Sequence, residues 1–351
     1  MAQPNPHPPN RMQVAGTVSF YLVAALAMVM ANKWVLDVTT APLFFLFTQL
    51  LIAVVLFLGA NAVGIIKIPI HVDMIVIKGL APMIALNVVG LSANNYTLKF
   101  VDASFYQVAR GLVLPLTVLT SYLFLSSPPP SPRILLSCTL VTCGFFIGVF
   151  LDHTPVSPLG LFFGIISSAM TASHAVVIKK SLEVVGGSAL NLSYYSNLLS
   201  ALVLLPLIVV AGEGPEVMKL LVGEGDGFKT IFWGSTITGG LGFLMSIAST
   251  LSIKITSPIT HMISSAIRGV AASLLGMWLF KDVLSSGRVW AIAVILFGSL
   301  HYTWVKHIES QQPSAKAASK ASYDRIPLSD LEEAEEGKRG IEETNGNGRA
   351  H

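Results

Sequence analysis

The feature that most constrains this chain is a succession of apolar runs, each long enough to cross a lipid bilayer. A membrane-spanning helix needs roughly 17–25 mostly apolar residues, and the sequence contains ten runs of that kind. They cover residues 14–34, 42–60, 74–96, 103–125, 133–151, 158–180, 190–211, 229–252, 258–280 and 286–307. The connections between them are short and rich in proline and glycine. The pattern predicts an all-helical integral membrane protein with ten transmembrane helices.

The composition supports this interpretation and excludes several functions. Hydrophobic residues make up 53% of the chain and charged residues only 12%, whereas a soluble domain carries roughly 25% charged residues. No basic run or basic-aromatic patch predicts nucleic-acid binding. Sequence motifs of metalloproteases, serine hydrolases and phosphate-binding loops are missing. The two cysteines, Cys138 and Cys143, are five residues apart on different faces of one expected helix, so we expect neither a disulfide nor a metal site.

The runs divide the chain into two halves of five helices. Residues 14–151 form the expected first repeat, and residues 158–307 the second. Residues 1–13 and 311–351 are polar and low in apolar content, and we expect both to be disordered. Basic residues favour the loops on the side of the two termini, which predicts cytosolic termini. A signal peptide is the alternative for the first run, but no clear cleavage site follows it.

Two arginines stand inside the apolar runs, in similar surroundings. Aligning Arg110-Gly111 with Arg268-Gly269 places a polar residue one helical turn before each arginine, and a lysine and a polar turn farther upstream (Lys99 and Lys254). An arginine in mid-membrane costs roughly 2.5–3.5 kcal/mol on insertion scales unless a partner or an aqueous cavity receives it. The pattern favours an anion site formed by both halves. The alternatives are arginines that cap neighbouring carbonyl groups and a chance similarity of two apolar helices.

Other polar residues fall on single faces of the expected helices. Asn87 and Asn94 are seven residues apart, His261, Ser265 and Arg268 share a face, and residues 191–197 open the seventh run. Small hydroxylated residues also serve in ordinary helix packing, which stays the alternative for any single serine or threonine. No carboxylate lies in mid-span, which argues against a proton relay. Arginine can bind phosphate with two hydrogen bonds, and tyrosine can stack on a base, so a nucleotide derivative fits these residues.

At this level the sequence resembles a known family. The stretches ANNYTLKFVDASFYQVAR (93–110), LSIKITSPITHMISSAIRG (251–269) and SLHYTWVKHIE (299–309), with Asn32-Lys33, are similar to the nucleotide-sugar transporters of the drug/metabolite transporter superfamily. Among these, the GDP-fucose transporter branch is the closest. The resemblance implies ten helices in two inverted repeats, a Golgi or ER membrane, and exchange of a cytosolic nucleotide sugar for a lumenal nucleoside monophosphate by alternating access.

The motifs that bind the ligand in such relatives are altered here. An FYNN motif, associated with the base, corresponds to residues 194–197, where serine replaces the first asparagine. A GALNK motif corresponds to residues 264–268, where Arg268 replaces the lysine. GDP-fucose is the expected substrate; a UDP-sugar (UDP-galactofuranose or UDP-galactose) is the main alternative, followed by GDP-mannose and, more distantly, a sugar phosphate.

The expected site contains substrate-binding residues only, with no catalytic residue, metal or cofactor. A membrane enzyme is the weaker alternative because enzyme motifs are missing, and a receptor or scaffold protein would leave the polar faces unused. The oligomeric state stays open, and a homodimer is one alternative. The residues expected to bind the substrate are Asn87, Asn94, Lys99, Arg110, Tyr194, Tyr195, Asn197, Lys254, His261, Ser265 and Arg268.

Overall fold

Prolines and serines begin many of the helices. In the computed structural model of the protein, Pro42, Pro132 and Pro158 lie in the first turn of their helices, where a missing backbone N–H costs nothing. The hydroxyl groups of Ser157 and Ser188 accept hydrogen bonds from backbone N–H groups three residues later, at 3.4 and 3.2 Å. Such caps satisfy amides that have no partner within the helix. The proline- and glycine-rich connections of the sequence are therefore helix boundaries.

Every described element is a helix. The structure describes residues 11–71, 73–124, 129–151, 156–222, 227–255, 258–282 and 285–311, without the side chains of 11–15, 17, 18, 21, 179, 221, 227, 246–255, 258–267, 310 and 311. The helices are α1 (Arg11–Val38), α2 (Pro42–Ala62), α3 (Met74–Phe100), α4 (Ala103–Gly111), α5 (Val113–Phe124), α6 (Pro132–Phe150), α7 (Pro158–Val184), α8 (Ala189–Val210), α9 (Gly214–Val222), α10 (Gly227–Ile255), α11 (Pro258–Phe280) and α12 (Ser286–Gln311). Residues up to Val305 form one compact unit, and the contacts below belong to it.

Most expected ranges coincide with helices, and the differences have physical causes. The fourth run is two helices, α4 and α5, that meet at Leu112 directly after Arg110-Gly111. α1 begins at Arg11, so the expectation of a disordered segment up to residue 13 is wrong for its last three residues. The connection after α8, expected to be a loop, contains the short helix α9. The expected disorder of residues 1–10 and 312–351 lies outside the described residues.

Among the described residues, seven helical segments are long and apolar enough to cross a membrane. The expectation of an all-helical, multi-pass membrane protein is therefore supported. α1, α10 and α11 include residues whose side chains are not described, and the expected total of ten spans stays a prediction. The seven segments are Pro42–Ala62, Met74–Phe100, Ala103–Phe124, Pro132–Phe150, Pro158–Ile178, Ala189–Val210 and Ser286–Glu309.

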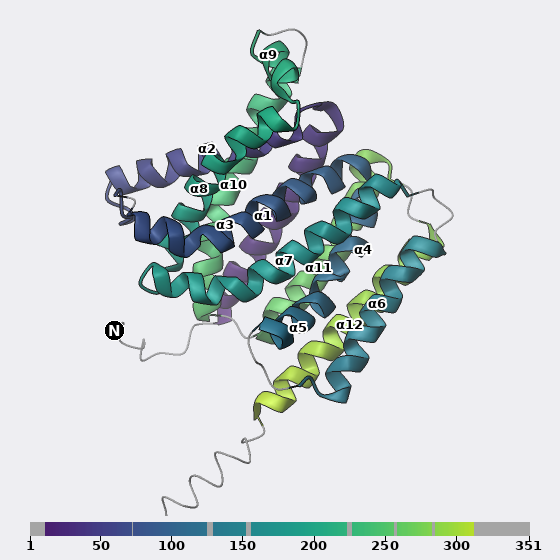
Figure 1. Ribbon diagram of the computed structural model, residues 1–351. Coiled ribbons are helices and arrows are strands. Elements are labelled where there is room, and N and C mark those ends of the chain that lie inside the picture. Colours follow the sequence, from purple (N-terminus) through teal and green to yellow (C-terminus); the bar gives the residue numbers. More distant parts are fainter. Residues whose placement is uncertain are drawn as a thin grey trace, which may run out of the picture. The chain divides into compact units, whose positions relative to one another are not determined.

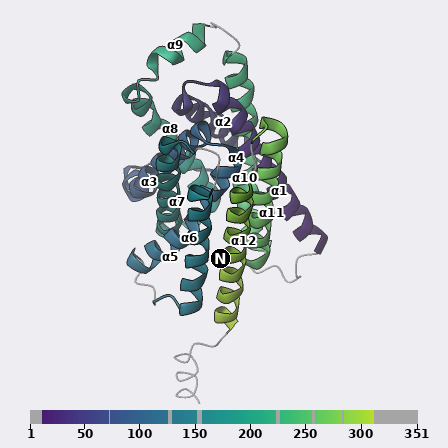
Figure 2. The ribbon, with the colours of Figure 1, turned by 90° about the vertical axis from the view of Figure 1, so that its right-hand side faces the viewer.

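Helices from the two halves of the chain pack against one another. α3 packs along α7, α1 along α10, and α2 along both α8 and α10 (Figure 1). α6 and α12 run side by side in both views (Figures 1 and 2) and approach closely at two glycines. A Cβ atom on Gly144 would lie 2.7 Å from Ile295 Cγ1, and one on Gly298 would lie 2.7 Å from Val141 Cγ2. Such small residues let helix backbones meet in a membrane, where packing rather than the hydrophobic effect drives association.

Charged residues at one end of the bundle are buried and paired, although the sequence suggests exposed loops there. Arg288, at the start of α12, is 1% exposed; its Nη1 donates to Asp102 Oδ2 at 2.6 Å and to Ser104 Oγ at 2.9 Å. The carboxylate of Glu213 accepts from the backbone N–H groups of Leu43 and Phe44, at 3.0 and 2.9 Å. The first turn of α2 is thus capped by a residue 170 positions away. Sequence spacing alone cannot reveal such a pairing.

Candidate binding cavity

The break between α4 and α5 positions Arg110. The N–H of Leu112 bonds to the carbonyl of Ala109 at 3.2 Å, which tightens the last turn of α4. At the break Gly111 lies against α12, because a Cβ atom there would be 2.9 Å from Ile295 Cδ1. The sequence pattern Arg-Gly therefore serves two purposes. The glycine lets α12 approach, and the arginine extends from the end of a short helix toward the space beyond it.

A cavity of about 310 Å³ lies beside this break. α4, α5, α11 and α12 line it, so both halves of the chain contribute. Arg110 and Arg268 both lie on its wall, as expected from the alignment of the two arginine blocks, and its lining includes no carboxylate among the described residues. The lining residues are Gln107, Arg110, Gly111, Val113, Leu114, Thr117, Arg268, Gly269, Ile292, Ile295, Leu296, Ser299 and Tyr302.

A chain of hydrogen bonds holds Arg110 in place. Its Nη1 donates to the Tyr106 hydroxyl at 2.8 Å, and this hydroxyl donates to Asn94 Oδ1 at 2.8 Å. Ser167 Oγ of α7 donates to the same oxygen of Asn94 at 3.4 Å. The guanidinium carbon also lies 5.6 Å from the centre of the Tyr106 ring, within the range of a cation–π interaction. Tyr106, Asn94 and Ser167 thus connect the arginine to three helices, α4, α3 and α7.

Two predicted asparagines have structural partners. Asn94 belongs to the chain that holds Arg110, and its role there is indirect. Asn87 Nδ2 donates to the hydroxyls of Ser196 and Ser200 on α8, at 3.2 and 3.0 Å. Asn87 therefore links α3 to α8 and is not among the residues that line the cavity.

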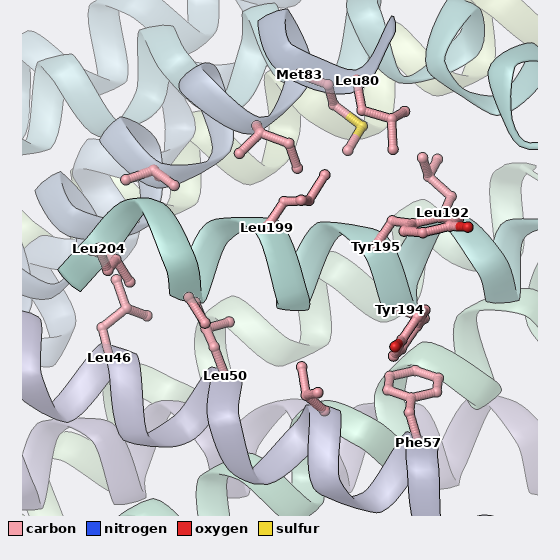
Figure 3. Packing of buried hydrophobic residues seen from close by; sticks show 14 of the residues in the cluster. Leu46, Leu50, Phe57, Leu80, Met83, Leu192, Tyr194, Tyr195, Leu199 and Leu204 are labelled. Carbon is pink, nitrogen blue, oxygen red and sulfur yellow. The ribbon is translucent and has the colours of Figure 1, made fainter. Parts of the chain in front are cut away.

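The predicted residues of α8 are also away from the cavity in this structure. Tyr194 and Tyr195 are 3% and 4% exposed and pack in an apolar cluster with Phe57, Leu80 and other residues (Figure 3). The Tyr195 hydroxyl donates to the carbonyl of His71 at 3.1 Å. Asn197 Nδ2 donates to the carbonyl of Ser193 in its own helix at 2.7 Å. A helical face inferred from spacing cannot tell a cavity from a packed neighbour, which is why the sequence suggested a binding surface here.

The remaining predicted residues stand as follows. Lys99 is half-buried in the last turn of α3 and is not in the cavity lining. Lys254, His261 and Ser265 have side chains outside the described residues. Their binding roles, like those of Asn87, Tyr194, Tyr195 and Asn197, stay predictions.

Sequence reasoning missed four polar residues of the cavity. Gln107 and Thr117 lie on the same side of α4 and α5 as Arg110, at offsets of minus three and plus seven. Ser299 and Tyr302 continue a face of α12 that begins at Ile292, at offsets of seven and ten. Offsets of three, seven and ten residues mark one helical face. That spacing was a usable signal, but residues 292–302 of α12 include no Asp, Glu, Lys or Arg to draw attention to it.

Comparisons with known proteins agree with this architecture. The model of the Triose-phosphate Transporter family matches residues 12–303. The chain belongs to this family. Three similar proteins are the GDP-fucose transporter 1 of Mus musculus, the GDP-fucose transporter of Caenorhabditis elegans, and the "GDP-fucose transporter, Golgi" of Drosophila melanogaster. The mouse protein is 30% identical over 89% of this chain and 89% of its own length. The Caenorhabditis protein is 32% identical over 90% of this chain and 89% of its own length. The Drosophila protein is 29% identical over 88% of this chain and 96% of its own length. The resemblance to the GDP-fucose branch is confirmed.

Membership in the Triose-phosphate Transporter family makes this chain a multi-pass membrane transporter rather than an enzyme, as the sequence predicted. A solved crystal structure that is 12% identical and covers 84% of this chain and 98% of its own has a TM-score of 0.53. At this low sequence identity, the similarity to the solved structure concerns the fold alone.

Proposed function

We propose that the chain is a Golgi nucleotide-sugar transporter of the GDP-fucose type, which exchanges a cytosolic nucleotide sugar for a lumenal nucleoside monophosphate by alternating access. The observation that carries the proposal is the cavity between Arg110 and Arg268. The similarity to GDP-fucose transporters along most of the chain supports the choice of substrate.

The charge of the cavity suits a diphosphate. Arg110 and Arg268 lie on its wall, and no carboxylate lines it among the described residues. A phosphate oxygen pair can accept two hydrogen bonds from one guanidinium, which gives both affinity and orientation. The hydrogen-bond chain from Arg110 through Tyr106 to Asn94 fixes the first arginine before the ligand arrives. We therefore assign the diphosphate to the space between the two arginines, and Gln107 to the adjoining polar surface.

The wall formed by α12 suits a deoxy sugar. Ile292, Ile295 and Leu296 give it three apolar side chains, and Ser299 adds one hydroxyl. Fucose is a 6-deoxy sugar whose methyl group can lie on such a wall, whereas the hydroxymethyl group of mannose would lose water there. Discrimination of this kind amounts to roughly 100-fold at most, since an apolar pocket rejects an added hydroxyl only weakly. The cavity is at the lower end of the usual 300–1,000 Å³ for small-molecule pockets, so it would hold only part of the nucleotide sugar.

The helix contacts support two inverted repeats of five spans. In order along the chain, α1, α2, α3, α4 with α5, and α6 correspond to α7, α8, α10, α11 and α12. When each helix is replaced by its counterpart, the pair α3–α7 becomes α10–α1, and the pair α3–α8 becomes α10–α2. The same exchange turns the α1–α11 pair into α7 with α4 and α5. All of these pairs are in contact. A site between the symmetry-related α4 and α11 is where a transporter built from inverted repeats binds its substrate.

The Golgi is the proposed membrane. The printed name of the Drosophila relative includes the Golgi, which favours that membrane over the ER. Cytosolic termini and a homodimer are further expectations. Protease protection of tagged termini in sealed vesicles tests the first, and light scattering of the detergent-solubilised protein tests the second.

The deciding experiment is counterflow in liposomes. Purified protein in vesicles preloaded with GMP is expected to take up radiolabelled GDP-fucose, whereas empty vesicles and vesicles preloaded with UMP are not. Arg268→Gln should lower this uptake by about 100-fold. Arg133→Gln, at an exposed arginine at the start of α6, serves as the matched control. Uptake of a UDP-sugar against UMP would replace the guanosine substrate by a uridine one. No exchange with any nucleotide, but exchange of triose phosphate against phosphate, would overturn the nucleotide-sugar assignment.

A thermal-shift screen against GMP, UMP, CMP and AMP gives an independent test of the base. A ligand that binds the folded state raises its apparent stability by mass action. Stabilisation by GMP alone is the expected result, and stabilisation by UMP alone contradicts it.

A further inference from the structure

A second cavity, of about 220 Å³, lies between α2, α9 and α10 and shares no lining residue with the cavity of the two arginines. α9 stands at the end of the bundle where α8 ends and α10 begins (Figures 1 and 2). None of the lining residues that the structure describes is charged, so the second cavity does not suit an anionic substrate. Most of its wall is apolar and includes Phe44, Leu51, Leu220, Phe228 and Phe232.

The polar side chains in this wall, Thr48 and Ser235, are already bonded within the protein. Their hydroxyl oxygens lie 2.6 Å apart, and Thr48 Oγ1 donates to the carbonyl of Phe45 at 2.8 Å. Because a hydroxyl has one proton to donate, Ser235 is the donor of the bond between the two hydroxyls. Water needs two to four polar partners to occupy a cavity, and apolar cavities stay dry. The wall of this cavity therefore suits a hydrocarbon.

Contacts on either side of the cavity fix its walls. Glu213, in the connection between α8 and α9, accepts hydrogen bonds from two backbone N–H groups in the first turn of α2. Close to it in the chain, Glu216 Oε2 accepts a hydrogen bond from Thr40 Oγ1 at 3.1 Å. Deeper in the bundle, α10 meets α2 at Gly239, where a Cβ atom would lie 2.8 Å from Ile52 Cβ. α9 is therefore tethered at one end of the cavity, and α2 packs on α10 at the other.

The cavity lies near one membrane surface. Its lining residues fall between residues 44 and 52 of α2 and between residues 228 and 235 of α10, in the first turns of both helices. At 1.5 Å per residue, the deepest of them is about 15 Å from the start of its helix, half of the roughly 30 Å of hydrocarbon in a bilayer. Trp233, in the same stretch of α10, is exposed, and tryptophan is enriched at membrane surfaces. The cavity thus lies within one leaflet.

The cavity opens on the outer face of the bundle. Leu51 and Phe232, on its α2 and α10 walls, are both exposed. Leu51 shares one face of α2 with Val55 and Leu58, at offsets of four and seven residues, and both of these side chains are exposed as well. α2 is long and apolar enough to cross a membrane, so a continuous exposed apolar face on it contacts lipid chains. The mouth of the cavity is part of that face.

We propose that this cavity binds one acyl chain of a membrane phospholipid. The outer opening admits a chain from the surrounding leaflet, and the apolar wall encloses it. Lys229, exposed in the first turn of α10 beside Phe228, lies at the level of the lipid phosphate and can pair with it. A sterol has no such charge, which favours the phospholipid. This inference rests on the chain being a membrane protein and does not depend on its substrate.

Packing supplies the driving force for this binding. Within a membrane there is no hydrophobic gain from moving a chain between lipid and protein, and close packing decides which surfaces associate. An unfilled cavity leaves the atoms of its wall without contacts on one side, and a lipid chain restores those contacts. The bound chain contacts α2 from the first half of the protein and α9 and α10 from the second. It should therefore stabilise the contact between the two halves.

The test is photochemical crosslinking in liposomes. The purified protein is reconstituted in phosphatidylcholine that includes a small share of phosphatidylcholine with a diazirine in one acyl chain, and the crosslinked residues are identified by mass spectrometry. Crosslinks should concentrate on residues 44–52 and 228–235 and be rarer at Ile237 and Leu244, which are exposed on α10 outside the cavity. Leu51→Trp fills the mouth and should lower crosslinking to residues 228–235 by about fivefold, the effect of losing about ten close carbon contacts. Leu202→Trp, at an exposed leucine of α8 outside the cavity, is the matched control.

Thermal stability in detergent is the second readout. Adding phosphatidylcholine to the delipidated protein should raise the melting temperature of the unchanged and Leu202→Trp proteins by mass action, and raise that of Leu51→Trp less. Crosslinks spread evenly over the exposed faces of α2 and α10, or equal effects of the two tryptophan variants, would refute the site. Crosslinking that an excess of cholesterol removes and unlabelled phosphatidylcholine does not would refute the phospholipid and assign a sterol. Both readouts are taken without nucleotide, so they are independent of the outcome of the counterflow experiment.

Discussion

Two arginine sites in this protein, at Arg288 and at Arg110, differ in their burial and in their surroundings. Arg288 is sealed from solvent and bonded to the carboxylate of Asp102. Arg110 lines a cavity together with Arg268, and its Nη1 donates to the hydroxyl of Tyr106 at 2.8 Å. The first arrangement neutralises its charge within the protein. The second places two arginines on the wall of a cavity. The two sites therefore differ in access: one guanidinium is sealed inside the protein, and the other lies on a cavity wall.

The largest effect should come from the structural arginine. Arg288→Met removes the ion-pair partner of Asp102, whose side chain is 37% exposed, and losing hydrogen bonds to a charged group costs about 1.5–3 kcal/mol. We expect a large loss of thermal stability in detergent, whereas Arg133→Met should have little effect. The double change Asp102→Asn, Arg288→Met should recover part of the loss. A stable, fully folded Arg288→Met protein would remove the contrast between the two sites.

The two arginines of the cavity, Arg110 and Arg268, should instead affect transport much more than thermal stability. Arg268→Ala and Arg110→Gln are expected to lower transport by about 100-fold, because each removes charge-assisted hydrogen bonds to the diphosphate, while the melting temperature changes little. Transport per folded protein in liposomes and thermal stability are measured on the same samples. Normal transport by Arg268→Ala would refute the site.

Tyr106 tests the positioning of Arg110. Tyr106→Phe removes the hydroxyl between Arg110 and Asn94 and keeps the ring beneath the guanidinium. One hydrogen bond is worth about 1 kcal/mol, so we expect a decrease of about fivefold in transport efficiency, seen mainly in KM for the nucleotide sugar. Tyr122→Phe, on an exposed tyrosine of α5, is the control. An equal decrease in both variants would mean that the chain from Asn94 does not position the arginine.

Asn87 separates a packing role from a binding role. Its amide bonds to Ser196 and Ser200 join α3 to α8, and hydrogen bonds between membrane helices average about 0.6 kcal/mol. Asn87→Ala should therefore lower the stability slightly and leave KM unchanged. A raised KM with unchanged stability would return Asn87 to the binding site, as the sequence predicted.

The sequence predicted most of the helices because the length of an apolar run is local information, and the repeated Arg-Gly dipeptide indicated two residues that line one cavity. Apolar length defines a span, and Arg110-Gly111 and Arg268-Gly269 repeat the same dipeptide at matching positions. The directions of Tyr194 and Tyr195 could not be predicted, because both a cavity and a neighbouring helix accept an amphipathic tyrosine. Long-range partners such as Glu213 on the first turn of α2 were also hidden. Only the folded chain brings these residues together.

The smallest effect should come from Asp282, at the same end as Arg288. Burial raises the pKa of this carboxyl above its ordinary value, and the charge of Asp102 raises it further, while the Ala103 N–H, Lys33 and Arg288 act in the opposite direction. A raised pKa means that the ionised form weakens the folded state, so this group's contribution to stability improves as pH falls through the raised pKa. Asp282→Asn keeps an oxygen for the Ala103 N–H and removes the charge. We expect it to change the stability by less than about 1 kcal/mol at pH 7.5, in the stabilising direction. Its advantage should shrink toward pH 4 in thermal unfolding experiments. A marked loss of stability at pH 7.5 would instead show that Asp282, like Asp102, is needed as a charged partner of Arg288 and Lys33.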